Sequence, residues 1–222
     1  MKKLSIFDST LRDGAQSTGI SFSLEDKLAI IKLLDRIGVD YIEAGNPYSN
    51  PKDSELYRRA ASLSLQHSRL CAFGSTMHKD SCPERDSNLQ ALALADTGTC
   101  VIFGKCWLFH VENVLETTPE ENLRMIRESC RFLKDRGKEV VFDGEHFFDG
   151  FKEHSEYALK ALEAAAEGGA DMLCLCDTNG GAFPNEVEKI VRQVKKHFSL
   201  PLSVHFHDDC GMATANSLMG VL

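Results

Sequence analysis

The chain has 222 residues, with a hydrophobic fraction of 43% and a charged fraction of 26%, which suits one sizeable soluble domain. The net charge of -8 argues against binding to nucleic acid or to an anionic membrane surface. No apolar run approaches the ~20 residues that a membrane-spanning helix needs. Met1 to Leu4 lead into a strand-like segment and not into the apolar core of a signal peptide, so we expect a cytoplasmic protein.

The cysteines are scattered and show neither a Cys-x-x-Cys pair nor the spacing of a disulfide framework. Cys174-Leu175-Cys176 is the closest pair. A zinc site there would need further ligands, and none lie nearby in sequence. We therefore expect two reduced thiols in or beside a buried strand.

Short apolar runs alternate with longer amphipathic segments along the chain. The runs are rich in β-branched or aromatic residues and lie close to turn residues, as is typical of buried parallel strands. Seven strands are predicted, at residues 4–7, 39–44, 70–73, 100–103, 140–142, 172–176 and 202–206.

The segments between the runs carry signals for helix starts and ends. Ser23 is placed to cap a first helix, and Ile30, Leu33, Leu34 and Ile37 then fall on one helical face. The pattern predicts that this face is buried.

Later helices have equally readable limits. Thr118-Pro119 begins one helix, with a cap residue followed by proline at the first helical position, and Gly137 ends it. An alanine-rich helix is predicted over 155–167, and another over 184–197.

This βα repeat of about seven units fits a doubly wound sheet or a (β/α)8 TIM barrel. No Gly-x-Gly-x-x-Gly follows the first strand, and polar residues cluster just after several strand ends, which favours the α/β barrel. We expect residues 1–222 to form a catalytic TIM-barrel domain that stops after seven strands, without the eighth strand and without a C-terminal domain.

His205-Phe206-His207 is the first candidate site. Residues i and i+2 of a strand share a face and lie about 6.6 Å apart, so two imidazoles can converge on one ion. The alternative is a pair of ordinary polar residues at the end of a strand.

The turn after the first strand is dense in charge. Asp13 can offer a carboxylate to a metal, and Arg12 can clamp a substrate carboxylate or stabilise an oxyanion, although a surface Arg–Asp pair is the alternative. The first and seventh strands of a barrel are separated only by the eighth. Asp13, His205 and His207 can therefore form one facial site for Mg²⁺, Mn²⁺ or Zn²⁺.

Three further residues follow strand ends. Glu145 can act as a general acid or base or order such a group, and Thr178 precedes a helix and can seat a carboxylate. A solvated loop and a glycine-rich turn are the respective alternatives. Glu43, at the end of the second strand, is a weaker candidate.

Two motifs together resemble a known family. Asp-x-Thr-Leu-Arg-Asp-Gly-x-Gln at 8–16 and His-x-His-Asp-Asp-x-Gly-x-Ala at 205–213 resemble the TIM-barrel, metal-dependent acyl-CoA condensing enzymes and lyases. That group includes isopropylmalate, homocitrate and citramalate synthases and hydroxymethylglutaryl-CoA lyase. Residues 102–105, 143–150 and 176–181 look most like the citramalate synthase branch.

The resemblance implies a condensation of acetyl-CoA with a 2-oxo acid in branched-chain amino-acid biosynthesis. Arg12 would bind the 2-oxo acid and stabilise the forming alkoxide, Thr178 would hold its carboxylate, and Glu145 would support proton transfer from acetyl-CoA. The divalent metal would be bound by Asp13, His205 and His207. The full-length protein would be a homodimer.

Some residues depart from the family pattern. The family's asparagine ligand after the eighth strand has no counterpart, Met77-His78 stand where a basic pair is usual, and Leu108 stands where an acid is expected. Two alternatives stay open: a lyase that cleaves a 3-hydroxyacyl-CoA, and a non-catalytic fragment that keeps a metal site.

Overall fold

The structure is a computed structural model that describes residues 4–222. The expectation for the first three residues lies outside the described part of the chain. Seven parallel strands form one sheet in the order β1-β2-β3-β4-β5-β6-β7. They are β1 (Phe7–Asp8), β2 (Tyr41–Gly45), β3 (Arg69–Ser75), β4 (Thr99–Lys105), β5 (Glu139–Glu145), β6 (Met172–Asp177) and β7 (Leu202–Phe206).

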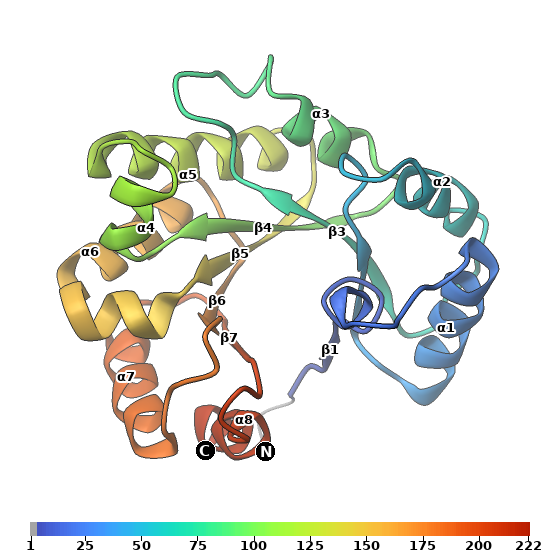
Figure 1. The fold of residues 1–222 in the computed structure, drawn as a ribbon. Coiled ribbons are helices and arrows are strands. Elements are labelled where there is room, and N and C mark those ends of the chain that lie inside the picture. The colour runs from blue at the N-terminus through green and yellow to red at the C-terminus, as the bar shows by residue number, and fades with distance from the viewer. Residues whose placement is uncertain (1–3) are drawn as a thin grey trace.

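Helices cover the outside of this sheet, which curves into an incomplete barrel (Figure 1). They are α1 (Leu24–Ile37), α2 (Pro51–Ala60), α3 (Ser87–Leu94), α4 (Leu108–Asn113), α5 (Pro119–Lys134), α6 (Phe147–Glu167), α7 (Pro184–His197) and α8 (Ala213–Val221), with a short 3-10 turn, η1, at Gly14–Gln16. Within residues 4–222, no helix combines the length and the apolar character needed to cross a membrane.

The strand order decides between the two architectures considered. A doubly wound sheet reverses its strand order at a switch point, whereas here every strand pairs with its sequence neighbours. The barrel prediction is confirmed, with seven strands where a closed (β/α)8 barrel has eight. The first strand is displaced from its predicted place at residues 4–7, because ladder pairing with β2 begins only at Phe7.

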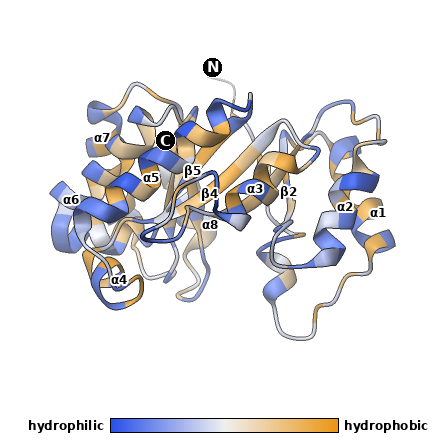
Figure 2. Ribbon diagram, turned by 90° about the horizontal axis from the view of Figure 1, so that it is seen from above, coloured by the Kyte–Doolittle hydropathy of each residue, from blue (hydrophilic) through white to orange (hydrophobic). Residues whose placement is uncertain are grey.

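Apolar side chains form two separate layers. The larger core lies between the strands and the helices, and residues such as Ile42, Ile102 and Phe142 are fully buried there. A smaller cluster fills the inside of the barrel, with Val101 and Val141 among its members. Apolar colour concentrates in the strands, whereas the helices carry both polar and apolar colour (Figure 2).

The buried face of α1 differs from the prediction. Leu34 is buried and Ile30 is partly buried, but Leu33 and Ile37 are 49% and 68% exposed. The buried face instead includes Lys27, whose ammonium lies 2.6 Å from Asp53 Oδ1 on α2. Leu28, Ile31 and Leu34, spaced three residues apart, form the apolar part of this buried face, so the prediction chose the other of two overlapping apolar stripes.

The other helix limits agree more closely with the sequence. Ser23 accepts the N–H of Asp26 and closes a capping box, and Thr118 caps α5 as predicted. The helix predicted over 155–167 is confirmed as the second part of α6, which follows a non-helical residue at His154; a first part that was not predicted begins at Phe147. The predicted limits of α7 are confirmed.

Candidate active site

Asp13, His205 and His207 meet at the carboxyl end of the barrel. Asp13 Oδ2 lies 3.2 Å from His205 Nε2 and 3.5 Å from His207 Nε2, although the chain separates Asp13 from His205 by 192 positions. The two imidazoles are stacked, with their ring centroids 5.2 Å apart. The structure therefore brings together the three side chains that the sequence selected.

The local backbone explains how Asp13 reaches this position. The N–H groups of Arg12, Asp13 and Gly14 all bond to the carbonyl of Ser9, which folds the chain back directly after β1. The hydrogen bond with His205 lowers the pKa of Asp13 to about 2, with further help from Arg12 and against the effect of burial. Asp13 is therefore a carboxylate at neutral pH.

This arrangement fits a divalent cation. One ligand atom from each of Asp13, His205 and His207 can be chosen so that all three lie within 4.8 Å of one another. One carboxylate oxygen and two imidazole nitrogens on one side of an ion leave its remaining positions open to substrate or water. The donor set suits Mg²⁺, Mn²⁺ or Zn²⁺.

Arg12 lies beside this cluster and is held on three sides. Its Nε donates to Glu43 Oε2 at 2.5 Å, its Nη1 donates to Asp13 Oδ1 at 3.1 Å, and its guanidinium lies 3.9 Å above the ring of Phe73. Burial opposes its charge, but the carboxylates of Glu43 and Asp13 outweigh that effect and raise the pKa of Arg12. Glu43, which the sequence marks as a weak candidate, thus positions Arg12.

Two buried acids on the barrel side of this cluster carry raised pKa values. Burial raises the pKa of Glu43 to about 7, against the opposing effect of Arg12. Burial also raises the pKa of Asp143 on β5, although His205 and Arg12 favour its charged form. Such shifted acids concentrate at functional sites, so they support the choice of this edge of the barrel.

Glu145 and Thr178 belong to a second group at the same end of the barrel. Glu145 contacts the ammonium of Lys105, its register partner on β4. Thr178 Oγ1 accepts the backbone N–H of His146 at 2.9 Å. Neither residue has a recorded contact with Asp13, so the predicted residues form two groups and not one cluster.

Asp177, the residue before Thr178, links the two groups through hydrogen bonds. The backbone N–H of His207 donates to the carbonyl of Asp177 at 3.2 Å, at the end of β6. The carboxylate of Asp177 in turn accepts the N–H groups of Gly181 and Ala182, at 3.2 and 3.0 Å. This network fixes Thr178 next to the end of β7, within the same rim of the barrel.

Sequence reasoning missed an aromatic cluster beside Glu145. The rings of His110 and His146 meet edge to face with centroids 4.3 Å apart, and Trp107 lies 4.8 Å from His110. The Nδ1 atoms of both histidines are buried and make no hydrogen bond to the described residues, although His146 Nδ1 lies 3.7 Å from Asp149 Oδ2. Only the left-handed backbone of His146, at φ 52°, marks this turn, and that feature cannot be read from the sequence.

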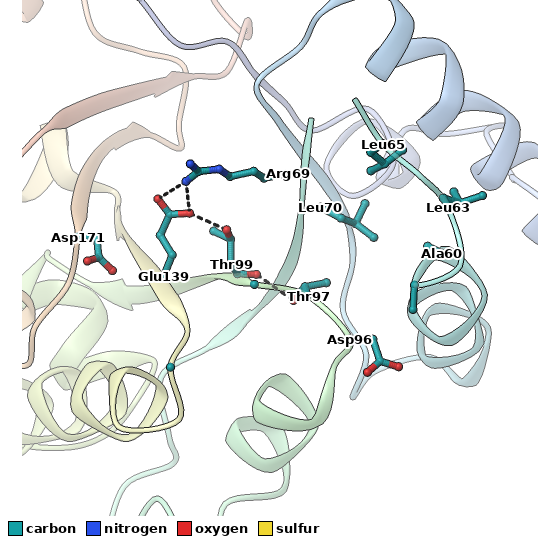
Figure 3. Close-up of a pocket in the computed structure, with 13 residues that line it drawn as sticks. Ala60, Leu63, Leu65, Arg69, Leu70, Asp96, Thr97, Thr99, Glu139 and Asp171 are labelled. Atoms are coloured by element: carbon teal, nitrogen blue, oxygen red, sulfur yellow. Dashed lines mark hydrogen bonds and ion pairs between the residues drawn. The ribbon is translucent and has the colours of Figure 1, made fainter. Parts of the chain in front are cut away.

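The opposite end of the barrel holds a cavity of about 670 Å³ (Figure 3). Arg69 Nη1 lies 3.0 Å from both carboxylate oxygens of Glu139, and Thr99 Oγ1 donates to Glu139 at 2.7 Å. These three residues are the first residues of their strands, whereas the active sites of TIM-barrel enzymes lie at the carboxyl ends of the strands. The cluster therefore ties the strand starts together and is not the candidate site.

The fold and the site define a TIM-barrel protein with a candidate ion site of one carboxylate and two imidazoles at its carboxyl edge. More narrowly, the chain belongs to the HMGL-like family, whose model matches residues 3–222.

Known proteins similar to this chain include citramalate and 2-isopropylmalate synthases. It is 48% identical over 221 residues to an (R)-citramalate synthase of Sulfolobus acidocaldarius, and the match covers 100% of this chain and 42% of that protein. It is 33% identical to a 2-isopropylmalate synthase of Halalkalibacterium halodurans, with the same two coverages. The chain therefore spans less than half the length of these relatives.

The structural comparison supports the fold. The HMG-CoA lyase of Bacillus subtilis matches with a TM-score of 0.81 and 22% sequence identity, covering 100% of this chain and 74% of that one. At this level of identity the likeness shows a shared barrel and nothing about chemistry.

Proposed function

We propose that the complete protein condenses acetyl-CoA with a 2-oxo acid, with pyruvate as the preferred acid and citramalate as the product. One observation carries the proposal: the carboxylate of Asp13 and the imidazoles of His205 and His207 converge beside a buried, fixed guanidinium. The identity with (R)-citramalate synthases supports the choice of pyruvate.

Asp13, His205 and His207 would hold the divalent ion. When bound there, the ion would supply Lewis-acid polarisation of the substrate carbonyl. The low pKa of Asp13 keeps this ligand ionised at neutral pH, so the protein presents a charged carboxylate to the cation without having to lose a proton first.

Arg12 is placed to receive the negative charge that forms on the substrate. Its Nε and Nη1 are engaged by Glu43 and Asp13, and its Nη2 has no recorded partner within residues 4–222. The free N–H groups of Nη2 can donate to the keto oxygen as it becomes an alkoxide. Because Phe73 and Glu43 already fix the guanidinium plane, little reorganisation is needed during reaction.

Thr178 can bind the substrate carboxylate. Its hydroxyl oxygen accepts the N–H of His146, which leaves the hydroxyl hydrogen free to donate to a substrate oxygen. Glu145, which contacts the ammonium of Lys105, would take a proton from the methyl group of acetyl-CoA, or hold the group that does.

The bond changes balance without a redox partner. The methyl carbon of acetyl-CoA loses a proton and forms a bond to the keto carbon, and the keto oxygen takes up a proton. Water then cleaves the thioester and releases free CoA thiol, which drives the reaction forward.

The test is free-thiol release by the complete gene product supplied with acetyl-CoA, a divalent cation and a series of 2-oxo acids. We expect the fastest release with pyruvate, and a product with the mass of citramalate. Cleavage of 3-hydroxyacyl-CoA substrates, with no thiol release from any 2-oxo acid, would instead assign the protein to the lyase side of the family.

Replacement of Arg12 by lysine probes the proposed alkoxide contact. Lysine keeps the charge but cannot bond Glu43, Asp13 and substrate from one planar group, so Arg12→Lys should lower kcat/KM about a hundredfold or more. Arg69→Lys, at the opposite end of the barrel, is the matched control and should keep wild-type kcat/KM. Equal activity of the two variants would remove Arg12 from the mechanism.

We also propose a cytoplasmic location and, following the family resemblance, a homodimer for the complete protein. All eight cysteines of the chain are free thiols, which agrees with a reducing compartment.

A further inference from the structure

Two thiols lie on the inner face of β6, on the barrel side of the candidate ion site. Cys174 and Cys176 are two positions apart, so both point to the same face of the strand. Both are buried and free, and their Sγ atoms are 4.0 Å apart. They belong to the small cluster that fills the inside of the barrel.

The neighbouring strands supply the further ligands that the sequence around these cysteines lacks. Asp143 on β5 is the register partner of Cys174, and His205 on β7 is the register partner of Cys176. One ligand atom each from Asp143, Cys176 and His205 can be chosen so that all three lie within 4.8 Å of one another. Three adjacent strands therefore bring a carboxylate, the thiol of Cys176 and an imidazole to one place, and Cys174 adds a second thiol next to Cys176.

The distances suit a tetrahedral thiolate site. With zinc–sulfur bonds of about 2.3 Å, two sulfur ligands of a tetrahedron lie about 3.8 Å apart. The Sγ–Sγ separation of 4.0 Å is close to that value before any adjustment. Cys174 is not one of the three residues whose ligand atoms all lie within 4.8 Å of one another, but its Sγ is close enough to Cys176 Sγ to join them as a fourth donor.

The presence of sulfur ligands distinguishes the residues around Cys176 from the site at Asp13. Thiolates prefer soft or borderline ions such as Cd²⁺ and Zn²⁺, whereas Asp13 with two imidazoles also accepts Mg²⁺ and Mn²⁺. We propose that Asp143, Cys174, Cys176 and His205 form a second cation site that is selective for thiophilic divalent ions. Binding displaces the thiol protons to solvent and oxidises nothing.

His205 is common to both sites, which couples them. Two dications a few ångströms apart repel each other and compete for the same imidazole. A thiophilic ion at the cysteine site therefore weakens binding at the Asp13 site, and the weakening is reciprocal. Only this consequence rests on the proposed function; the cysteine site stands on its own geometry.

The test is a Cd²⁺ titration of the chelator-treated complete protein, followed by the ultraviolet charge-transfer band of cadmium–thiolate bonds. We expect the band to saturate at one equivalent. Cys176→Ser should abolish it. Cys71→Ser, which removes another buried thiol from the same inner cluster, should retain it. No band in the wild-type protein, or equal loss in both variants, would overturn the proposal.

Mn²⁺ binding separates the two sites. Asp13→Asn should lose Mn²⁺ affinity and keep the cadmium band, whereas Cys176→Ser should do the reverse. Unchanged Mn²⁺ affinity in Asp13→Asn would contradict the proposed function but leave the cysteine site standing.

X-ray absorption at the cadmium edge identifies the ligand atoms of bound Cd²⁺ without the need for a variant. We expect sulfur among the ligands of the first equivalent of Cd²⁺ in the wild-type protein. A shell of nitrogen and oxygen only would overturn the proposal even if the serine variants failed to fold.

Discussion

At the scale of single residues, the buried acid Asp35 is held ionised mainly by backbone N–H groups. Asp35, near the end of α1, accepts N–H groups from Gln66, His67 and Ser68 in the loop before β3, at distances between 2.8 and 3.1 Å. Burial opposes the charge, but these N–H groups outweigh it and lower the pKa of Asp35 to about 2. The carboxylate thereby fixes a loop that has no regular structure.

This depressed pKa predicts a pH-dependent contribution to stability. A folded-state pKa below the unfolded value gives stabilisation that is full above about pH 4 and is lost as the pH falls toward 2. Asp35→Asn keeps the accepting oxygen but removes the charge, so it should cost about 1–2 kcal/mol at pH 7 and progressively less below pH 4. Urea unfolding at several pH values measures this difference.

Asp96→Asn is the control, because Asp96 is an exposed acid just before β4. Because a substitution of an exposed side chain rarely costs more, it should change the free energy of unfolding at pH 7 by less than about 0.5 kcal/mol. A loss in Asp35→Asn that does not shrink on acidification would mean that packing, and not charge, explains the cost.

The residues of the site differ in how far the sequence could identify them. His205 and His207 share a strand face, and Asp13 follows the first strand, so barrel topology alone predicts that they approach each other. The bond between Arg12 and Glu43 could not be predicted, because it depends on the register of β1 and β2 and on the fold of the Ser9 turn. The ligand partners of Cys176 were missed for the same reason: they come from other strands.

At the scale of elements, the contact between α6 and the end of β4 positions the second group of the site. Gly150, in the first turn of α6, packs against the backbone of Cys106 and Trp107, and an added Cβ would overlap the Cys106 carbonyl. The segment after Cys106 leads into α4, which carries His110. Only glycine allows α6 to approach the loop this closely.

Gly150→Ala should therefore separate α6 from this loop. We expect a loss of about 1–3 kcal/mol in the free energy of unfolding, which is the usual cost of overpacking a filled site. Gly98→Ala is the matched control, since its added Cβ meets no atom within 4 Å, and its effect should stay within about 0.5 kcal/mol. Equal melting temperatures for the two variants would show that the loop moves aside without cost.

Helix limits were more predictable than helix faces. Ser23 and Thr118 carry local capping chemistry, and the structure confirms both. The buried face of α1 was harder to predict, because Leu28, Ile31 and Leu34 form a second apolar stripe, which Lys27 joins through its ion pair with Asp53 on α2. The part of α6 before its kink at His154 was missed, since it follows a left-handed residue, His146, for which the sequence has no signal.

At the scale of the whole molecule, the candidate ion site joins the two outer strands of an open sheet. Along the described chain, β1 pairs only with β2 and β7 only with β6. Asp13 follows β1, while His205 lies on β7, so their contact spans the side of the barrel that the sheet leaves open (Figure 1). A bound cation would therefore both prepare the site for chemistry and connect the first and last strands.

Anomalous diffraction from a crystal of the protein grown with Mn²⁺ tests this account most directly. We expect one anomalous peak for a Mn²⁺ ion bonded to an oxygen of Asp13 and to a ring nitrogen of each of His205 and His207, at about 2.0–2.3 Å. We also expect the peak to be absent from crystals of His207→Ala. A manganese peak at other residues, or none while these three side chains keep their mutual contacts, would contradict it.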